Sequence, residues 1–220
     1  MSNILCFDFS SHNLVVAASI NGKLYSFLWE AEKNSSEKIW EVLHSIFRIA
    51  GEEFDNVDVY GIGIGPGYFT GMRVALSIVK GFNLVRKSKI VAIPSYDILA
   101  HALLGIDRVC VSFDARRNLF YAACYRRKKG RIEKILSERL IDYSQLQKFI
   151  ERDFYLCGDA ANFLSPQDRE KAKIISASFW KINPYVFIDL CREKALKGKF
   201  TDVRRLNLLY LHPQTCQIRK

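Results

Sequence analysis

One order of predicted elements occurs twice along the chain: three strands, a helix, a strand and a helix, with a period of about 105 residues. In the first half, strands are expected at 4–9, 14–20, 23–29, 57–64 and 89–93, and helices at 36–50, 70–85 and 95–104, with Ser36 as a candidate cap. In the second half, strands are expected at 108–113, 119–125, 131–139, 154–157 and 173–175, and helices at 143–151 and 184–197. A chain of 220 residues accommodates two such units.

Two short turn signals and two acids strengthen this repeat. Asn21-Gly22 and Lys129-Gly130 each separate the second predicted strand from the third, and Asn-Gly favours the turn of a tight β-hairpin. The first strand of each half ends in an aspartate, at Asp8 and Asp114. Chance repetition of so coarse a pattern is the alternative to a true duplication.

Three antiparallel strands followed by helix, strand and helix predict an α/β fold in which a mixed sheet is flanked by helices. Two such units, with an acid at the end of each first strand, fit the duplicated ribonuclease-H-like architecture of actin, hexokinase and Hsp70 (ASKHA). We expect one lobe over residues 1–104 and a second lobe over 105–220.

Composition narrows the class of protein. Hydrophobic residues make up 49% and charged residues 25%, which supports a packed core. No apolar run reaches the ~20 residues that a membrane span needs, and an acid at position 8 argues against a signal peptide, so we expect a cytoplasmic protein with no membrane partner. Buried thiols in a reducing compartment are expected at Cys6, Cys110, Cys124, Cys157, Cys191 and Cys216.

The chain is basic, with 33 Lys+Arg against 23 Asp+Glu and a formal net charge of +10. The surplus is clustered at 86–89, 116–117, 126–131 and 204–205. Such clusters favour polyanionic partners, although a solvated face is the simpler interpretation and no RRM, KH or zinc-knuckle motif accompanies them.

The most informative stretch is rich in glycine and lies between a predicted strand and a predicted helix. Its signature positions are Gly65, Pro66, Gly67, Phe69, Thr70, Gly71 and Arg73. It is neither a Walker A loop nor a dinucleotide fingerprint, because both spacings are missing. A structural turn and a phosphate site remain equal alternatives from the residues alone.

Residues 65–73, GPGYFTGMR, resemble the G-P-G-S-F-T-G-L-R signature of the TsaB (YeaZ) family. Residues 8–10, DFS, are similar to the family's opening D-T-S; residues 112–117 with Tyr121 resemble its D-A-R segment; and residues 209–211 resemble its C-terminal P-x-Y-L. The chain departs from the family at Tyr68, where serine is usual, at Ala75, where glycine is usual, and at 35–37, where His-Ser-Glu is common.

The resemblance implies a non-catalytic dimerisation and activating subunit of the complex that makes N6-threonylcarbamoyladenosine (t6A) in tRNA. A TsaD-like catalytic subunit would transfer the threonylcarbamoyl group. A TsaE-like ATPase would join through the complex, and tRNA could be contacted there. It implies no catalytic residue, cofactor or metal in this chain. A proteolytic side role of the family cannot be judged from the sequence.

The residues exclude several kinds of chemistry. No two of the four histidines, at 12, 44, 101 and 212, are spaced i,i+4, so the histidine metal pair of the catalytic relative is missing, and so is a G-x-S-x-G nucleophile. Asp8 and Asp114 are weak candidates for a nucleotide site, which would make the chain a stand-alone ASKHA-type small-molecule kinase. The simpler interpretation is that both are turn residues at strand ends.

The first two predicted helices carry more apolar surface than one sheet covers. The helix at 36–50 has two adjacent apolar stripes, and the helix at 70–85 has small residues among large apolar ones. We expect a partner interface at Ile39, Trp40, Leu43, Phe47, Gly71, Ala75, Ile78 and Phe82. The partner would be the TsaD-like subunit or, in a homodimer, a second copy; deep burial within one domain is the alternative.

Overall fold

The computed structural model describes residues 2–31 and 35–212, and the side chains of all of these except 35–37. The chain divides into two compact units. Of the described residues, those up to 98 and 182–208 form unit 1, and 99–181 with 209–212 form unit 2. Each described unit contains one five-stranded sheet.

The sheet of unit 1 has the strand order β3-β2-β1-β4-β5. Its strands are β1 (Ile4–Asp8), β2 (Asn13–Ile20), β3 (Lys23–Glu30), β4 (Val59–Gly63) and β5 (Lys89–Ile93). The first three are antiparallel neighbours, whereas β4 lies parallel to β1 and β5 parallel to β4. Every residue of β1 and β4 is buried, as expected for strands covered on both faces.

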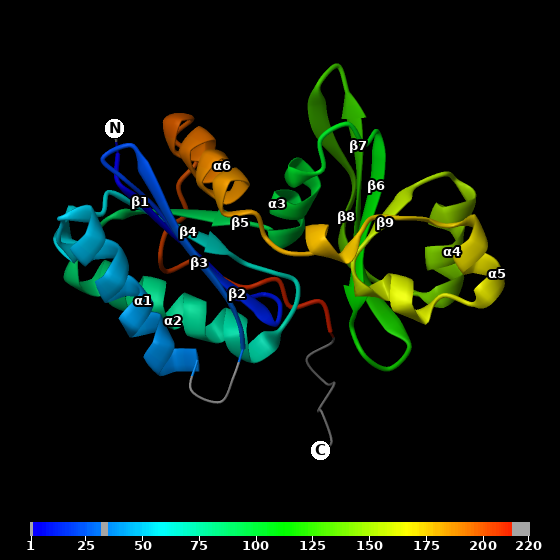
Figure 1. Ribbon diagram of the computed structural model, residues 1–220, viewed down its shortest axis with the longest axis horizontal. Helices are drawn as coiled ribbons and strands as arrows, with labels where there is room; N and C mark the ends of the chain where they lie inside the picture. The colour runs from blue at the N-terminus through cyan, green and yellow to red at the C-terminus, as the bar shows by residue number, and fades with distance from the viewer. Residues whose placement is uncertain (1, 32–34, 213–220) are drawn as a thin grey trace. The chain divides into compact units, whose positions relative to one another are not determined.

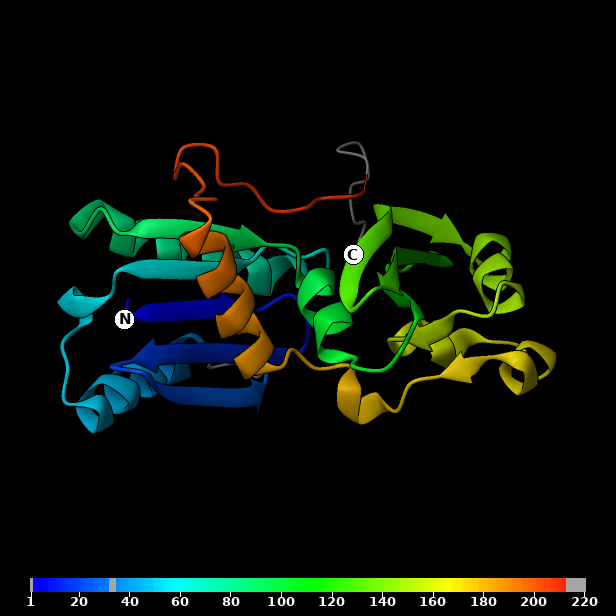
Figure 2. The same cartoon turned by 90° about the horizontal axis from the view of Figure 1, so that it is seen from above.

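Helices cover both faces of this sheet. The helices α1 (Ser35–Ala50) and α2 (Phe69–Val85) lie on one face, and α6 (Pro184–Leu196) crosses the other (Figures 1 and 2). The core beneath α1 and α2 is apolar and includes Phe7, Ile46 and Val79. The predicted cap role of the Ser36 side chain lies outside the described residues.

The sheet of unit 2 has the equivalent order β10-β9-β6-β7-β8. Its elements are β6 (Arg108–Asp114), β7 (Leu119–Lys128), β8 (Arg131–Asp142), α4 (Tyr143–Glu151), β9 (Tyr155–Cys157), α5 (Pro166–Lys171) and β10 (Lys173–Ile174). The strands β6, β7 and β8 are antiparallel, and β9 lies parallel to β6. The repeated order of strands confirms the predicted duplicated ribonuclease-H-like fold.

Three features of the repeat differ from the sequence expectation. β8 runs to Asp142 rather than 139, where Asp142 caps α4 by accepting a hydrogen bond from the Gln145 backbone N–H. The short helix α5 was not predicted, although Ser165 caps it and Pro166 begins it. Three-residue or five-residue 3-10 turns also occur, and such short elements leave little periodicity to detect.

The helix that closes the second predicted lobe belongs to unit 1. α6 packs on β1, β2, β4 and β5, and Arg192 on this helix donates a hydrogen bond to Ser19 Oγ on β2 (3.0 Å). The predicted lobe boundary between residues 104 and 105 therefore stays a prediction about where the sequence repeat begins again. In the structure, residues 182–208 pack with the first sheet. α3 (Ser95–Ala102) follows β5. Among the described residues, no helix is long and apolar enough to cross a bilayer.

Candidate functional site at the glycine-rich loop

The glycine-rich loop joins β4 to α2 and is held by backbone hydrogen bonds from two sides. Ile64 N–H donates to the Ile93 carbonyl (3.0 Å), and Gly65 N–H donates to Ser95 Oγ (3.1 Å) at the start of α3. Tyr68 N–H donates to the Ser10 carbonyl (2.6 Å) just beyond β1. The loop therefore uses its backbone donors to fasten neighbouring strand ends, and those donors are not free to cradle a phosphate.

Two glycines of the signature are required because the backbone of a neighbouring segment lies too close for a side chain. A Cβ on Gly67, which has φ +157°, would lie 1.9 Å from the Ser10 carbonyl oxygen. A Cβ on Gly71 would lie 2.3 Å from the Phe9 carbonyl oxygen, so this glycine lets α2 rest directly on the end of β1. Of the two interpretations left open by the sequence, the contacts of these described residues favour the structural turn.

Asp8 lies at the end of β1 and is fully buried beside this loop. Its Oδ1 accepts hydrogen bonds from the Ser10 backbone N–H (2.9 Å) and the Ser10 hydroxyl (2.6 Å), whereas Oδ2 has no hydrogen-bond partner among the described residues. Burial raises the pKa of the Asp8 carboxyl, and the nearby Ser10 and Ser95 hydroxyls offset this only in part. A Cβ on Gly63 would lie 1.9 Å from Oδ2, so glycine leaves room for the carboxyl group.

Asp114 occupies the equivalent position at the end of β6 but is more exposed. Its Oδ1 accepts a hydrogen bond from the Arg116 backbone N–H (2.8 Å), and its Oδ2 lies 3.4 Å from the Arg116 guanidinium. Its own N–H donates to Asp159 Oδ1 (2.7 Å). Both candidate acids thus bond the backbone N–H two residues ahead, which is the geometry of a turn residue.

The described residues contain no group of three or more His, Cys, Asp or Glu side chains placed to hold a metal ion. The five described cysteines are buried, and burial raises the pKa of the Cys157 thiol to about 12, so that it is not a reactive thiolate. Cys216 lies outside the described residues. His212 Nε2 lies 2.9 Å from the Ala115 carbonyl oxygen, and His44 lies at the surface of α1.

The predicted partner residues on α1 and α2 fall into two groups. Ile39, Leu43, Phe47, Gly71 and Ala75 are buried within unit 1. Trp40 is half exposed and Ile78 and Phe82 are partly buried. The wide apolar face of α1 is therefore largely covered by its own sheet, α2 and the loop after α1.

An aromatic cluster joins α1 to α2. The Trp40 and Phe82 rings meet edge to face with centroids 5.9 Å apart, and Phe82 also stacks on Tyr60 at 5.7 Å. Phe54, in the turn after α1, packs between Phe47 (4.2 Å) and Phe82 (6.0 Å). This cluster packs α1 against α2 and leaves half of the Trp40 side chain exposed.

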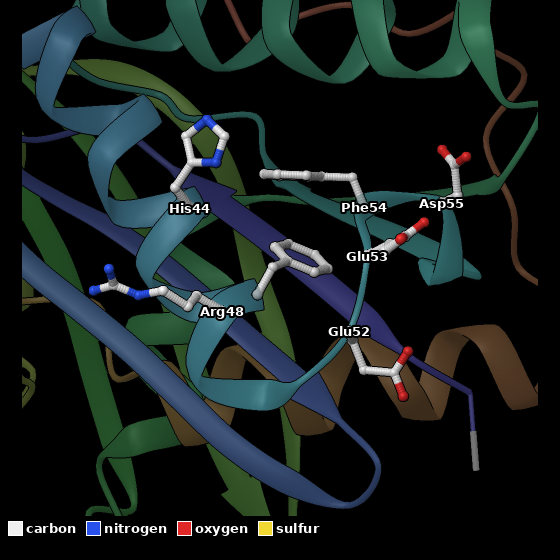
Figure 3. Close-up of a pocket in the computed structure, with 7 residues that line it drawn as sticks. His44, Arg48, Glu52, Glu53, Phe54 and Asp55 are labelled. Carbon is white, nitrogen blue, oxygen red and sulfur yellow. The ribbon is translucent and has the colours of Figure 1, made fainter.

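The end of α1 and the segment after it line an open pocket of about 420 Å³ (Figure 3). Its lining includes His44 and Arg48 on α1 and Glu52, Glu53 and Asp55 on the following segment. Glu52 accepts hydrogen bonds from the Asn21 (2.7 Å) and Asn56 (2.5 Å) side-chain amides, which lower its pKa. These bonds tie the β2–β3 turn to the segment after α1, so Glu52 has a structural role here.

Sequence reasoning missed Ser10 and Ser95, the two serines that bond the aspartate and the loop. Ser10 was visible as the third residue of the D-F-S run, and Ser95 as the residue after Pro94 at a strand-to-helix junction. Neither serine belongs to a periodic pattern. Ser10 bonds Asp8, two residues away, and Ser95 bonds Gly65, 30 residues away along the chain.

Comparison with known proteins gives a consistent set of relatives. A family model described as TsaD, tRNA N6-adenosine threonylcarbamoyltransferase, matches residues 29–191. The tRNA threonylcarbamoyladenosine biosynthesis protein TsaB of Buchnera aphidicola subsp. Acyrthosiphon pisum is 26% identical over 223 aligned residues, which cover 96% of this chain and 99% of that protein. The TsaB protein of Haemophilus influenzae is 25% identical over 161 residues, which cover 68% of each chain.

Two solved structures share the fold. YeaZ from Pseudomonas aeruginosa superposes with a TM-score of 0.77 at 21% identity, covering 96% of this chain and 100% of that one. A protein described as similar to peptidase YeaZ from Pseudomonas aeruginosa superposes with a TM-score of 0.79 at the same identity and coverage.

Proposed function

This chain belongs to the TsaB (YeaZ) family of tRNA threonylcarbamoyladenosine biosynthesis proteins, and we propose that it is a non-catalytic subunit that binds and activates a TsaD-like transferase. In this proposal the TsaD-like partner transfers the threonylcarbamoyl group to tRNA. A TsaE-like ATPase joins through the same complex in the cytoplasm, and this chain supplies the docking surface.

The observation that carries the proposal is the apolar surface left on the two helices that cover the first sheet. Trp40 is 50% exposed and Ile49 is 64% exposed on α1, and Leu84 and Val85 are 85% and 87% exposed at the end of α2. Ile49 lies nine residues after Trp40 and so on the opposite side of α1, which centres the docking surface on Trp40. Large exposed apolar side chains favour contact with another protein, and tryptophan is enriched among the residues that dominate binding energy.

The exposed side of α2 also has room for a second helix. A Cβ added to Gly81 would meet nothing within 4 Å, and Ser77, one turn earlier, is exposed. Small residues at such positions let a partner helix approach closely. By contrast, Gly71 and Ala75 are small because α2 rests on its own sheet, so they do not belong to the proposed docking surface.

The geometry of the two acids supports a non-catalytic role. Asp8 is closed off from solvent behind the glycine-rich loop, and Asp114 is paired with Arg116. A metal-assisted phosphate site needs carboxylate oxygens that can reach the ion and its water. No contact among the described residues specifically favours the alternative of a stand-alone kinase.

The decisive experiment replaces Trp40 by aspartate. Because the indole is half exposed, Trp40→Asp should leave the chain folded while placing a charge on the docking surface. We expect affinity for the TsaD-like partner to fall by at least about 30-fold, as for truncation of a central aromatic residue. The readout is co-purification, followed by t6A formation on tRNA with the partner proteins present.

Phe47 is unsuitable for the same test because it is only 4% exposed, and a charge there would disrupt the core. The matched control is Leu104→Asp, which charges a residue that is 80% exposed in unit 2. Equal binding by wild type and Trp40→Asp, with both folded by circular dichroism, would reject the proposed interface.

A further inference from the structure

We propose that the tip of the β7–β8 hairpin, residues 126–131, binds the phosphate backbone of RNA. We call these residues the basic arm; they read Arg-Arg-Lys-Lys-Gly-Arg. The inference rests on the proposed function, which brings tRNA to the complex. It adds a binding surface on unit 2 that is separate from the docking surface on α1 and α2.

The positive charge of the chain is unevenly distributed. Residues 1–98 contain 9 Lys+Arg and 10 Asp+Glu, whereas residues 99–181 contain 16 Lys+Arg and 10 Asp+Glu. The basic arm supplies five of those 16 cations within six positions. A charge surplus concentrated in one segment creates a local positive potential that neutral neighbours do not cancel.

The basic arm extends past its neighbouring strand. In the β6–β7 ladder the last pair is Arg108 with Arg126, and the Arg127 N–H still bonds the Asp107 carbonyl, so residues 128–131 pair solely within the hairpin itself. Figure 1 shows the β7–β8 hairpin running beyond the end of β6. The tip therefore presents its side chains to solvent from both strands.

Three cations of the arm have no ion partner among the described residues. Lys128, Lys129 and Arg131 are exposed and take part in none of the described ion pairs. Arg126, by contrast, lies 3.3 Å from Glu133. Solvated, unpaired cations are the groups that can release counterions from a phosphate backbone.

The register of the hairpin places the cations on a shared surface. Lys128 lies directly opposite Arg131, and Arg126 lies opposite Arg108 on β6. Directly opposite residues project to the same face of a sheet, and residues i and i+2 also share a face. Glu133, opposite Arg126, shares this face as well. Arg108, Arg126, Lys128 and Arg131 thus form a basic stripe across β6, β7 and β8 that contains one acid, while Lys128 and Arg131 at the tip carry only positive charge.

The arm is fixed at its base. Arg127 donates through Nη2 to the Leu103 carbonyl (3.1 Å), and its backbone N–H donates to the Asp107 carbonyl (2.7 Å). Lys129 and Gly130 have φ values of +49° and +76°, the conformation of a tight two-residue hairpin turn. A fixed arm loses little conformational entropy when it binds, which favours a built surface over a loose charged tail.

The chemistry of the tip favours RNA over a membrane or an aromatic-rich peptide. The four residues 128–131 include no apolar side chain that could insert into a bilayer, and Ile132 is partly buried. No aromatic residue lies in the arm to stack on a base. We therefore expect salt-dependent binding without base specificity.

The test uses the full chain and bulk tRNA, with binding followed by fluorescence anisotropy across salt concentrations. The variant Lys128→Gln, Lys129→Asn, Arg131→Gln removes the three unpaired cations, and asparagine suits the left-handed turn position. Because this variant can no longer neutralise about three phosphates, the slope of log affinity against log salt should become shallower by about 2 to 3. Affinity near 100 mM salt should fall roughly tenfold or more.

The matched control removes three exposed cations from unit 1, as Lys23→Gln, Arg86→Gln, Lys87→Gln, with the same change in net charge. We expect it to keep at least most of the wild-type salt slope. If both triple variants lose tRNA affinity equally, net charge rather than the arm is responsible and the proposal is wrong. It is also wrong if the arm variant loses binding to phosphatidylserine vesicles but keeps its affinity for tRNA.

The two proposals fail separately. The arm variant should co-purify with the TsaD-like partner as wild type does, whereas Trp40→Asp should bind tRNA as wild type does. Absence of partner binding by the wild-type protein would reject the proposed function but leave the tRNA measurement on the isolated chain interpretable. Unchanged tRNA affinity in the arm variant would reject the RNA surface alone.

Discussion

The ends of β1 and β6 occupy the same place in two copies of one fold, yet their acids differ in burial, in charged neighbours and in the backbone conformation of the turn that follows. Asp8 is fully buried with one oxygen that has no partner among the described residues, whereas Asp114 is partly exposed and lies beside the Arg116 guanidinium. The turn after Asp114 holds Arg116, Arg117 and Asn118 at φ between +56° and +66°, and none of residues 9–12, which follow Asp8, has a positive φ.

One feature is common to both strand ends. A Cβ on Gly67 would lie 1.9 Å from the Ser10 carbonyl oxygen, and a Cβ on Gly158 would lie 2.1 Å from the Ser112 carbonyl oxygen. In each unit, a glycine beyond a parallel strand packs against the backbone near the end of the first strand. The contact point differs, because Ser10 lies two residues after Asp8 and Ser112 lies two residues before Asp114.

The largest expected effect comes from filling the space beside Asp8. Gly63→Ala would place a Cβ 1.9 Å from Asp8 Oδ2 and 2.4 Å from its Cγ, so the buried Asp8 side chain or its strand would have to shift. We expect the free energy of unfolding to fall by about 3 kcal/mol, as for overpacking of a buried site. Urea denaturation of the full chain measures it.

The double variant Gly63→Ala, Asp8→Ala tests whether the carboxyl group is the cause. It should recover about 1–2 kcal/mol relative to the sum of the two single variants, because the clashing atoms are removed. In unit 2, Gly158→Ala should not be rescued by Asp114→Ala, since its clashes are with the Ser112 carbonyl group and the Phe113 ring. Additive free energies in both pairs would contradict this interpretation of Asp8.

The control for these glycine substitutions is Gly81→Ala, because a Cβ at Gly81 meets no neighbour. It should stabilise α2 by up to about 1 kcal/mol.

The pH dependence of stability should separate the two acids. Because the pKa of Asp8 is higher in the folded chain than its usual value of about 3.8, the folded state holds more protons above that pH. Its contribution to stability is complete below about 3.8 and is lost as the pH rises through the folded pKa. Relative to Asp8→Asn, wild type should therefore become progressively less stable as the pH rises toward neutrality.

Asp114→Asn provides the comparison in unit 2. The Arg116 side chain is 83% exposed, so loss of this ion pair should change the free energy of unfolding by less than about 1 kcal/mol. The measurement is the denaturation midpoint of wild type and both variants between pH 3.5 and 7. A constant difference between wild type and Asp8→Asn across that range would show that Asp8 is not destabilised by burial.

The smallest effects are expected in the two turns. Asn118 has φ +58°, so Asn118→Gly should stabilise unit 2 by no more than about 0.5 kcal/mol, because asparagine already tolerates this conformation. Ser11 does not have a positive φ, and its hydroxyl donates to the Asn13 carbonyl and accepts from the Asn13 N–H. Ser11→Gly should therefore destabilise unit 1 by about 1 kcal/mol. Thermal melts of both variants measure the shifts, and equal signs would contradict the contrast between the turns.

Much of the fold was predictable because its signals are local. The predicted strand at 89–93 has the same bounds as β5, and the Asn21-Gly22 and Lys129-Gly130 turns lie where the dipeptides indicated. Alternation and glycine placement act over a few residues, so one sequence is enough to detect them. The helix α5 and the end of β8 were less predictable, since a six-residue helix and a strand that becomes a cap leave almost no periodic pattern.

The candidate site was predictable in identity but not in environment. The glycine signature and both acids were found from residue types, and Ser10 and Arg116 are sequence neighbours of their acids. The burial of Asp8 was not predictable, because Gly63 and Ser95 reach it from distant parts of the chain. Likewise, the two apolar stripes of α1 gave no indication that Phe54 would cover the Phe47 side.

The order of the elements, the tight turns and the glycine-rich signature all follow from the amino-acid sequence. Only the tertiary structure decides which apolar side chains stay exposed and which sheet α6 packs on. It also decides which of the two aspartates is buried. The physical reason is that periodicity, turn chemistry and backbone conformation act between near neighbours. Burial and pKa instead depend on whatever segment the fold brings across from elsewhere in the chain.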